Sequence, residues 1–248
     1  MADAKVAVIL PAAGNSTRFG NSRRKKVFVD LRGRPVWLRA AEHFINRDDV
    51  AQVLVVVSPD DLTWFKEQYA ANVTLLGIEI IAGGAERADS VLNALARVRD
   101  DVEFVAVHDA ARPLLAKEWI DRVFAEARKC GGAILATPVT QTLKRGTAAG
   151  FVEETVSRER LWAAQTPQVF RKEWLVDAYA RRGKEPSTDE AQLIERSGRP
   201  VRLVECPALN IKITTQEDLK LAEAALDALP KPPGLRALHP FQDDDLFR

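Results

Sequence analysis

The sequence has 248 residues, 46% of them hydrophobic, and its formal net charge at pH 7 is +1. This length is enough for one sizeable hydrophobic core, so a large α/β domain with an insertion fits it well. Because acids and bases are balanced and well mixed, the composition argues against wholesale binding to nucleic acids or membrane surfaces. We predict a single domain over residues 1–229 and a flexible tail over residues 230–248.

Two features bear on the location of the protein in the cell. Cys130 and Cys206 lie far apart and fit no metal-binding spacing, which indicates reduced thiols rather than a disulfide framework. The N-terminal apolar run is short and is interrupted by Pro11, and no segment reaches the roughly 18 apolar residues of a membrane span. We expect a cytoplasmic protein that does not bind to a membrane.

The first forty residues contain the most informative segment. The apolar residues 6–10 predict a buried strand, which is followed by the small residues 11–14 (Pro-Ala-Ala-Gly) and then by the basic residues 23–26. Small residues let backbone N–H groups approach a ligand closely, and successive N–H groups in a tight loop attract anions. The spacing matches neither the Gly-x-Gly-x-x-Gly pattern nor a P-loop. We predict a phosphate-binding loop of another kind, with a merely basic strand-to-helix connection as the alternative.

Strands and helices alternate along the rest of the chain in the manner of repeated βαβ units. Apolar residues on one helical face predict helices around residues 91–98 and 119–127, and residues 215–218 form a capping signature for a final helix ending near residue 229. Near-continuous apolar strands predict a Rossmann-like, doubly wound, mostly parallel sheet covered on both faces. The expected strands are residues 53–57, 78–81, 104–108 and 133–136.

A different pattern follows residue 136. Residues 139–143 and 151–156 predict the strands of a protruding β-hairpin, joined by a turn over residues 144–150. A two-stranded hairpin is marginally stable alone. We therefore expect this arm, residues 138–160, to rest on something else, such as a second subunit.

A glycine-rich segment, residues 83–90, follows one predicted strand. Gly84 can bring the backbone close to a base or ribose, and Ser90 or its neighbours open a helix whose N-terminus favours an anion. The alternative is a plain helix cap with Arg87 in solvent.

Polar residues also occur in two later segments, residues 108–113 and 210–214, which we place at or within apolar strands. Asp109 could hold a hard cation such as Mg²⁺, for which one carboxylate suffices when substrate phosphates fill other positions. Arg112 could bind a phosphate, or it could simply pair with Asp109 across a turn. His108 is expected to be a packed strand residue. Lys212 lies between two isoleucines and should point away from their face, toward a ligand at the end of the sheet.

The basic residues Arg18, Lys25, Lys26, Arg112 and Lys212 all belong to strand ends or adjoining loops. The chain offers no Ser/His/Asp or Cys/His set that could act as a nucleophile. This inventory suits phosphoryl or nucleotidyl transfer, in which catalysis is mostly orientation and neutralisation of developing negative charge.

The chain resembles the 2-C-methyl-D-erythritol 4-phosphate cytidylyltransferases of the non-mevalonate isoprenoid pathway. The matching segments span most of the chain in the family's order, and they are highly specific together although each is weak alone. They are residues 11–14 with Arg18, 26–28 leading to 33–35, 84–90, 107–113, 166–168, 188–191 and 210–214. The resemblance implies a sheet of the nucleotidyltransferase type.

The resemblance also implies a set of roles. CTP would be bound by Pro11, Ala12, Ala13, Gly14, Gly84, Arg87 and Ser90, and Mg²⁺ by Asp109. Arg18, Lys26, Arg158 and Lys212 would be catalytic, and Arg112, Thr142 and Thr188 would bind methylerythritol phosphate together with Arg158 and Lys212. Because Thr142 and Arg158 flank the arm, which crosses to the partner subunit in this family, the implied active site is shared across a homodimer.

The chain departs from the family pattern at three places. Ser16 replaces a frequent glycine, and the usual Pro or Asn before the catalytic lysine is absent, so Lys25 competes with Lys26 for that role. Spacing from Gly33 favours Lys26. Leu209 replaces a frequent acidic residue, which leaves a second metal ligand, such as Asn210, open.

Three other functions remain as alternatives. A sister cytidylyltransferase would act on ribitol 5-phosphate instead. A catalytically inactive homologue would serve as a binding protein. A nucleic-acid-binding module would use residues 23–26, although the near-neutral charge argues against it.

Overall fold

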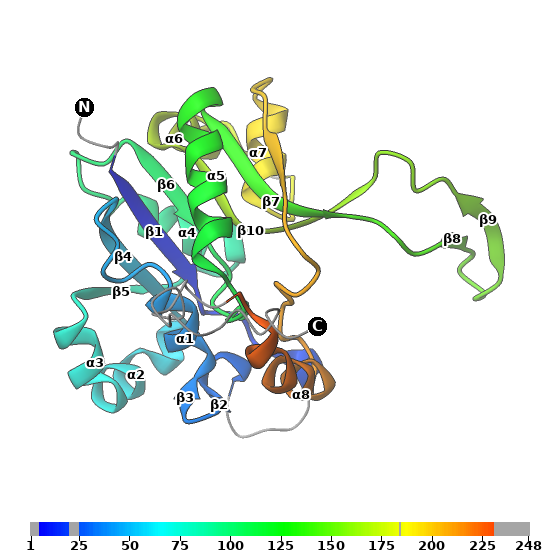
Figure 1. The fold of residues 1–248 in the computed structure, drawn as a ribbon. Coiled ribbons are helices and arrows are strands. Elements are labelled where there is room, and N and C mark those ends of the chain that lie inside the picture. Colours follow the sequence, from blue (N-terminus) through cyan, green and yellow to red (C-terminus); the bar gives the residue numbers. More distant parts are fainter. Residues whose placement is uncertain (1–4, 20–24, 184, 231–248) are drawn as a thin grey trace, which may run out of the picture.

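The computed structural model describes residues 5–19, 25–183 and 185–230. The strands of its central sheet are β1 (Val6–Pro11), β4 (Val50–Val57), β5 (Ile78–Ala82), β6 (Phe104–Val107), β7 (Gly132–Pro138), β10 (Trp162–Arg171) and β11 (Arg202–Glu205). They lie in the order β11-β7-β10-β6-β1-β4-β5 (Figure 1). β10 is antiparallel to both neighbours and the other pairs are parallel. The mostly parallel, doubly wound sheet is therefore confirmed, although β10 was not expected.

Helices cover both faces of this sheet, and β1 shows why. Val6, Val8 and Leu10 pack into one core with α1 (Val36–Glu42) and α5 (Lys117–Cys130), whereas Ala7 and Ile9 pack into a second core with α4 (Arg87–Leu95) and α6 (Lys172–Ala180). Successive side chains of a strand point to opposite faces, so an uninterrupted apolar strand needs cover on both. Figure 1 shows α5 in front of the sheet and α4 behind it. The helices are α1 (Val36–Glu42), α2 (Leu62–Gln68), α3 (Ala70–Leu75), α4 (Arg87–Leu95), α5 (Lys117–Cys130), α6 (Lys172–Ala180), α7 (Glu190–Arg196) and α8 (Gln216–Ala225).

The expected final helix is α8, which a 3₁₀ turn, η4 (Leu226–Ala228), extends. It begins with the capping box predicted from the sequence: the Asp218 N–H group donates to Thr215 Oγ1, and Asp218 Oδ2 accepts from the Thr215 N–H group. Its apolar face packs on Phe19 and Ile213 in a third core. This packing joins the C-terminal segment to the loop that follows β1.

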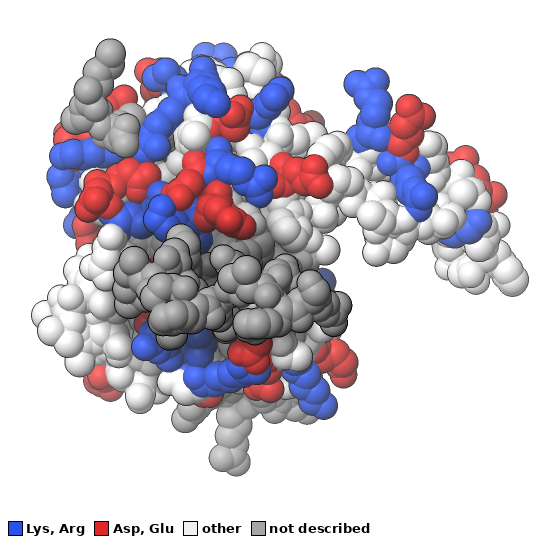
Figure 2. Space-filling model, in the orientation of Figure 1, with Lys and Arg blue, Asp and Glu red and all other residues white. Residues whose placement is uncertain are grey.

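The protruding hairpin is present as β8 (Leu143–Gly146) and β9 (Val152–Val156), which lie at the end of an arm that leaves the body between β7 and β10 (Figure 1). Residues 139–142, expected in its first strand, lie outside β8. Figure 2 shows the arm standing clear of the body, with charges of both signs on it.

The turn predicted over residues 144–150 is wrong in its extent, because residues 144–146 belong to β8. Arg145 pairs directly with Glu154 of β9 at 2.7 Å, and opposite charges across an antiparallel pair stabilise the strands. The chain reverses later, where Gly150 adopts φ +83°, a conformation that favours glycine. Cross-strand pairing therefore decided the position of the turn.

Several expectations concern the rest of the chain. Cys130 and Cys206 are free thiols, as predicted. Among the described residues, no helix is long and apolar enough to cross a membrane. The predicted tail beyond residue 230 and residues 23–24 of the basic cluster lie outside the described residues.

Candidate active site

A cavity of about 320 Å³ opens at the carboxyl ends of the central strands. β1 lies between β4 and β6, so the sheet reverses its direction of winding at this point. Open α/β sheets bind their ligands at such a position. Ten predicted site residues line the cavity: Pro11, Ala12, Ala13, Gly14, Lys26, Gly84, Arg87, Ser90, Asp109 and Lys212.

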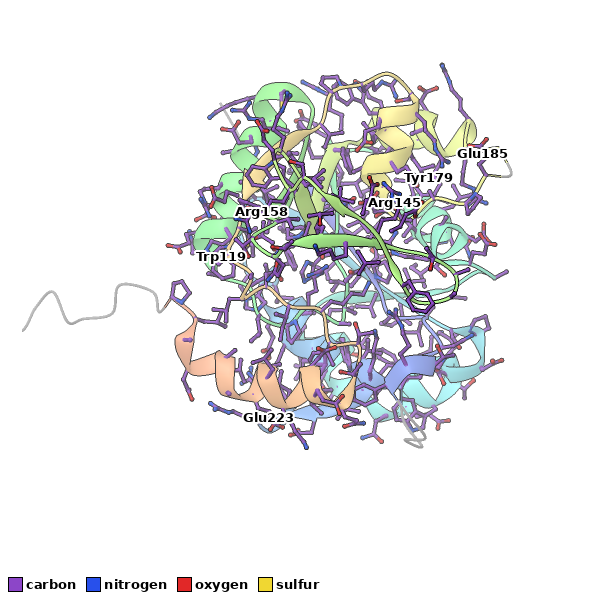
Figure 3. The ribbon with its side chains drawn as sticks, turned by 90° about the vertical axis from the view of Figure 1, so that its right-hand side faces the viewer. Trp119, Arg145, Arg158, Tyr179, Glu185 and Glu223 are labelled. Carbon is purple, nitrogen blue, oxygen red and sulfur yellow. The ribbon has the colours of Figure 1, made fainter. Side chains whose placement is uncertain are left out.

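Five predicted site residues do not line this cavity. Arg18 is exposed on the short 3₁₀ turn η1 (Thr17–Phe19), and Arg112 is half-buried behind Asp109. Thr188 is exposed just before α7. Thr142 and Arg158 are exposed on the arm, which Figure 3 turns toward the viewer.

The loop after β1 forms one wall of the cavity. The N–H group of Ala12 donates to Val56 O at 2.8 Å, whereas the N–H groups of Ala13, Gly14 and Asn15 donate to no described residue. A Cβ atom added at Gly14 would meet no protein atom within 4 Å. The loop therefore offers consecutive backbone donors beside open space, which suits an anion.

The glycine-rich segment also lines the cavity. Ser90 Oγ accepts from the Gly84 N–H group at 3.1 Å and donates to Glu86 O at 3.0 Å. A Cβ atom at Gly84 would lie 2.4 Å from Asp89 Cβ, so this close approach requires glycine. Glu86 and Asp89 form a capping box, and α4 therefore begins at Arg87, earlier than Ser90.

Arg87 does not lie free in solvent. Its guanidinium makes two hydrogen bonds to Glu190, at 2.6 and 2.9 Å, and Tyr179 Oη donates to the same carboxylate at 3.1 Å. Glu190 is only 1% exposed. Burial lowers the pKa of Arg87, but the charge of Glu190 more than compensates and raises it overall. Arg87 is thus a permanent cation held in one orientation at the cavity wall.

Asp109 lies at the centre of the cationic side chains. Lys212 Nζ is 2.9 Å from its carboxylate, Arg112 Nε is 3.4 Å away and Arg87 Nη2 is 3.7 Å away. Burial alone would raise the pKa of Asp109. The three positive charges lower it by a larger amount, so the pKa lies well below its usual range. The predicted alternative, a pair with Arg112 alone, is therefore incomplete.

The donor chemistry of the cavity fits a hard cation bound together with a ligand. Asp109 is a carboxylate that borders the cavity, and one carboxylate can hold Mg²⁺ when phosphates and water supply the other oxygens. Among the described residues, no group of three His, Cys, Asp or Glu side chains could hold a metal by itself. Asn210 is fully buried, and its Nδ2 donates to Thr166 O at 2.8 Å, so it does not reach the cavity.

The segment that contains Lys212 is not a strand, contrary to our expectation. It is fixed instead by the hydrogen bond from the Ile213 N–H group to Ala111 O, at 2.8 Å, and by burial of the Ile213 side chain beneath α8. The predicted orientation of Lys212 is nevertheless found, because Ile213 faces the core while Lys212 lines the cavity.

The structure distinguishes the two competing lysines. Lys26 lines the cavity, whereas Lys25 Nζ lies 2.7 Å from Asp61 Oδ2. Burial lowers the pKa of Lys26 to about 8, and the positive charges of Lys212 and Arg18 contribute to this shift. The nearby carboxylates therefore do not fully compensate the charge of Lys26.

His108 is a packed residue, as expected. It is fully buried, and its ring nitrogens lie 3.0 Å from Thr166 Oγ1 and 2.9 Å from Arg112 O. Burial lowers the pKa of His108 to about 3, so the ring is neutral near pH 7. It positions its neighbours rather than transferring protons.

Sequence reasoning missed two parts of the site. Residues 58–60, which follow β4, also line the cavity; the position of a polar Ser-Pro-Asp run at a strand end could have revealed them. The roles of Glu190 and Tyr179 as partners of Arg87 had no local signal.

Comparison with known proteins decides the family. The sequence model described as "IspD: 2-C-methyl-D-erythritol 4-phosphate cytidylyltransferase" matches residues 6–228. The chain belongs to this family. A 2-C-methyl-D-erythritol 4-phosphate cytidylyltransferase from Rhodopirellula baltica is 45% identical over 235 residues, covering 90% of this chain and 96% of the relative.

Two solved structures share the fold of this member of the cytidylyltransferase family. The 4-diphosphocytidyl-2C-methyl-D-erythritol synthase from Anaerococcus prevotii has a TM-score of 0.77 and 27% identity, and covers 90% of this chain and 96% of its own. The 2-C-methyl-D-erythritol 4-phosphate cytidylyltransferase from Thermus thermophilus has a TM-score of 0.72 and 32% identity, with coverages of 90% and 98%. The resemblance inferred from the sequence is thus confirmed.

We expect Glu190→Gln to lower the free energy of unfolding by about 3 kcal/mol, because it leaves the Arg87 charge with a neutral partner at a buried site. Urea unfolding followed by fluorescence measures this. The control is Glu185→Gln, because Glu185 is exposed and lies 3.8 Å from Arg196. That change should cost less than about 0.5 kcal/mol. Equal effects of the two substitutions would contradict the assigned role of Glu190.

Proposed function

We propose that the chain transfers the cytidylyl group of CTP to 2-C-methyl-D-erythritol 4-phosphate, a step of non-mevalonate isoprenoid precursor synthesis. The products are 4-diphosphocytidyl-2-C-methyl-D-erythritol and pyrophosphate. The observation that carries this proposal is the cavity of a family member, lined both by Lys26, Lys212 and Arg87 and by backbone donors that have no partner among the described residues. We place the enzyme in the cytoplasm, where its free thiols stay reduced.

The reaction is a single in-line displacement. A phosphate oxygen of the sugar alcohol forms a bond to the α-phosphorus of CTP, and the bond from that phosphorus to the bridging oxygen breaks. The electron pair of the broken bond leaves with pyrophosphate. No covalent enzyme intermediate is needed, so the protein contributes orientation and charge stabilisation.

The cavity residues would bind the nucleotide or stabilise charge, according to their position. The N–H groups of residues 13–15 would bind the triphosphate, and Gly84 with Ser90 would border the base and ribose. Lys26 and Lys212, with Arg18 from the rim, would stabilise negative charge that grows on the phosphates in the transition state. Mg²⁺ held by Asp109 and the phosphates would withdraw further charge when bound.

The acceptor phosphate needs residues beyond this cavity. Lys212 would orient the attacking oxygen, and Arg112 and Thr188, on the body, would bind the rest of the acceptor. Thr142 and Arg158 lie on the arm and do not line the cavity of their own chain. The arm also exposes Phe151, which is 73% accessible. These facts support a homodimer in which each arm completes the partner's active site.

Purified protein should release pyrophosphate from CTP only when methylerythritol phosphate and Mg²⁺ are present. Lys212→Met should lower kcat by about 100-fold, because it removes a charge aimed at the reacting phosphates. Lys129→Met, which removes an exposed ion pair with Glu126 on α5, is the matched control and should leave kcat unchanged. Faster turnover with ribitol 5-phosphate would contradict the proposed acceptor.

CTP affinity should depend on the protonation of Lys26. The lowered pKa, about 8, leaves Lys26 charged below pH 8, and bound triphosphate favours the charged form. The Kd for CTP should therefore be constant below pH 8 and rise by up to about tenfold per pH unit above it. Lys26→Arg stays charged and should remove this rise in calorimetric titrations from about pH 7 to 9.5. An identical rise in that variant would show that another group titrates.

Mixing two inactive variants tests the shared site. Arg158→Ala removes an active-site residue from the arm, and Lys212→Met removes one from the body. If each site combines the body of one chain with the arm of the other, a mixed dimer would contain one intact site. After reversible unfolding of an equal mixture, activity should return to about a quarter of the wild-type value, since half of the dimers would be mixed. Failure to recover activity, with mixed dimers shown by mass spectrometry, would show that Arg158 and Lys212 of one and the same chain act together, and would contradict a site shared between subunits.

A further inference from the structure

Lys26 lies in a short segment that needs outside support. It begins the 3₁₀ turn η2 (Lys26–Phe28), which is too short to hold an orientation by its own hydrogen bonds. The backbone N–H group of Lys26 donates to Ser16 Oγ at 3.1 Å. Ser16 itself has φ +54°, so the loop after β1 turns in the left-handed region to provide this acceptor. One side of the segment is thus tied to the loop that lines the cavity.

The other side is tied by an ion pair. Lys25 Nζ lies 2.7 Å from Asp61 Oδ2, and the two side chains are only 20% and 24% exposed. Asp61 ends the 3₁₀ turn η3 (Pro59–Asp61), and residues 58–60 line the cavity. The pair therefore joins the lysine segment to a different rim of the same cavity. Being sheltered from solvent, it is less screened than a surface pair.

Apolar packing supports the same attachment. The Phe28 ring lies 5.1 Å from the Trp64 ring and 5.7 Å from the Phe65 ring, both on α2, which starts directly after Asp61. Phe28 is buried beneath these rings. The packing of Phe28 thus attaches η2 to α2, next to the ion pair of the preceding residue.

From this arrangement we infer that the Lys25–Asp61 ion pair is a positioning device that holds Lys26 at the nucleotide cavity. The inference rests on the proposed function. Lys25 acts through Lys26 and not on the nucleotide, because its ammonium group is bound to Asp61 and it does not line the cavity. The charge that meets the phosphates is that of Lys26.

The backbone of Lys25 provides a sharp test. Its φ and ψ are −62° and 144°, and proline fixes φ near the same value. Among the described residues, none accepts a hydrogen bond from the Lys25 N–H group, which proline lacks. Lys25→Pro therefore keeps the backbone in front of Lys26 in place while removing the charge.

Kinetics with CTP and methylerythritol phosphate, and calorimetry with CTP alone, measure the effect. Lys25→Met and Asp61→Asn should each lower kcat about tenfold and raise the Kd for CTP about threefold, because a displaced Lys26 loses part of its contact with the phosphates. The double variant should be no worse than either single variant. Lys25→Pro should stay within about threefold of wild type in kcat. The control, Lys117→Met, removes an ion pair of the same length on α5 and should change neither quantity.

Unchanged kcat and Kd in Asp61→Asn would overturn the inference. A loss in Lys25→Met without any loss in Asp61→Asn would overturn it as well, because the Lys25 ammonium itself would then act on the nucleotide. Thermal unfolding identifies a variant that fails to fold, and Lys25→Arg, which keeps the pair, should then retain activity while Asp61→Asn does not. A wild type that binds CTP without releasing pyrophosphate contradicts the proposed function, yet the Kd values still decide the role of the pair. A wild type that binds no CTP overturns both.

Discussion

The carboxylate of Asp109 is the interaction around which the rest of the cavity is organised. It lies at the end of β6, almost fully buried, and Lys212, Arg112 and Arg87 approach it from three different segments of the chain. Each of these cations would be repelled by the others without a shared anion between them. Because the sheet places the end of β6 beside the end of β1, the same carboxylate brings the cations next to the loop that follows β1.

A second buried carboxylate extends this organisation into the core. Glu190 holds Arg87 through two hydrogen bonds, and Tyr179 donates to the same group from α6. Arg87 thus links the two carboxylates, since its guanidinium also lies 3.7 Å from Asp109. A buried ion pair contributes less to stability than its Coulomb energy suggests, because both charges lose hydration. The pair between Arg87 and Glu190 instead fixes the orientation of the Arg87 side chain at the cavity.

The hydrophobic periodicity and the capping residues of the sequence predicted those elements whose structure depends on neighbouring residues. The strands β1, β4, β5, β6 and β7, the capping box of α8 and the loop that follows β1 were predicted from periodicity and composition, and they lie close to their expected positions. Pairings between distant residues could not be predicted. Arg87 and Glu190 are 103 positions apart, and only the assembled sheet brings them together. β10 escaped notice because Gln165 and Gln168 lie within it, buried and hydrogen-bonded, and so break the apolar run.

The charge of Lys26 is only partly compensated within the protein, and this imbalance has a physical consequence for function. Burial, together with the nearby cations, disfavours the charged form of Lys26 and lowers its pKa despite the charge of Asp109. A nucleoside triphosphate bound as proposed would supply the missing negative charge, so its binding would stabilise the protonated form of Lys26. A lysine under such repulsion would turn toward solvent unless its backbone were held. The contacts of Ser16 and of Lys25 with Asp61 restrain the two sides of that segment, which explains why a cation can remain in place before its ligand arrives.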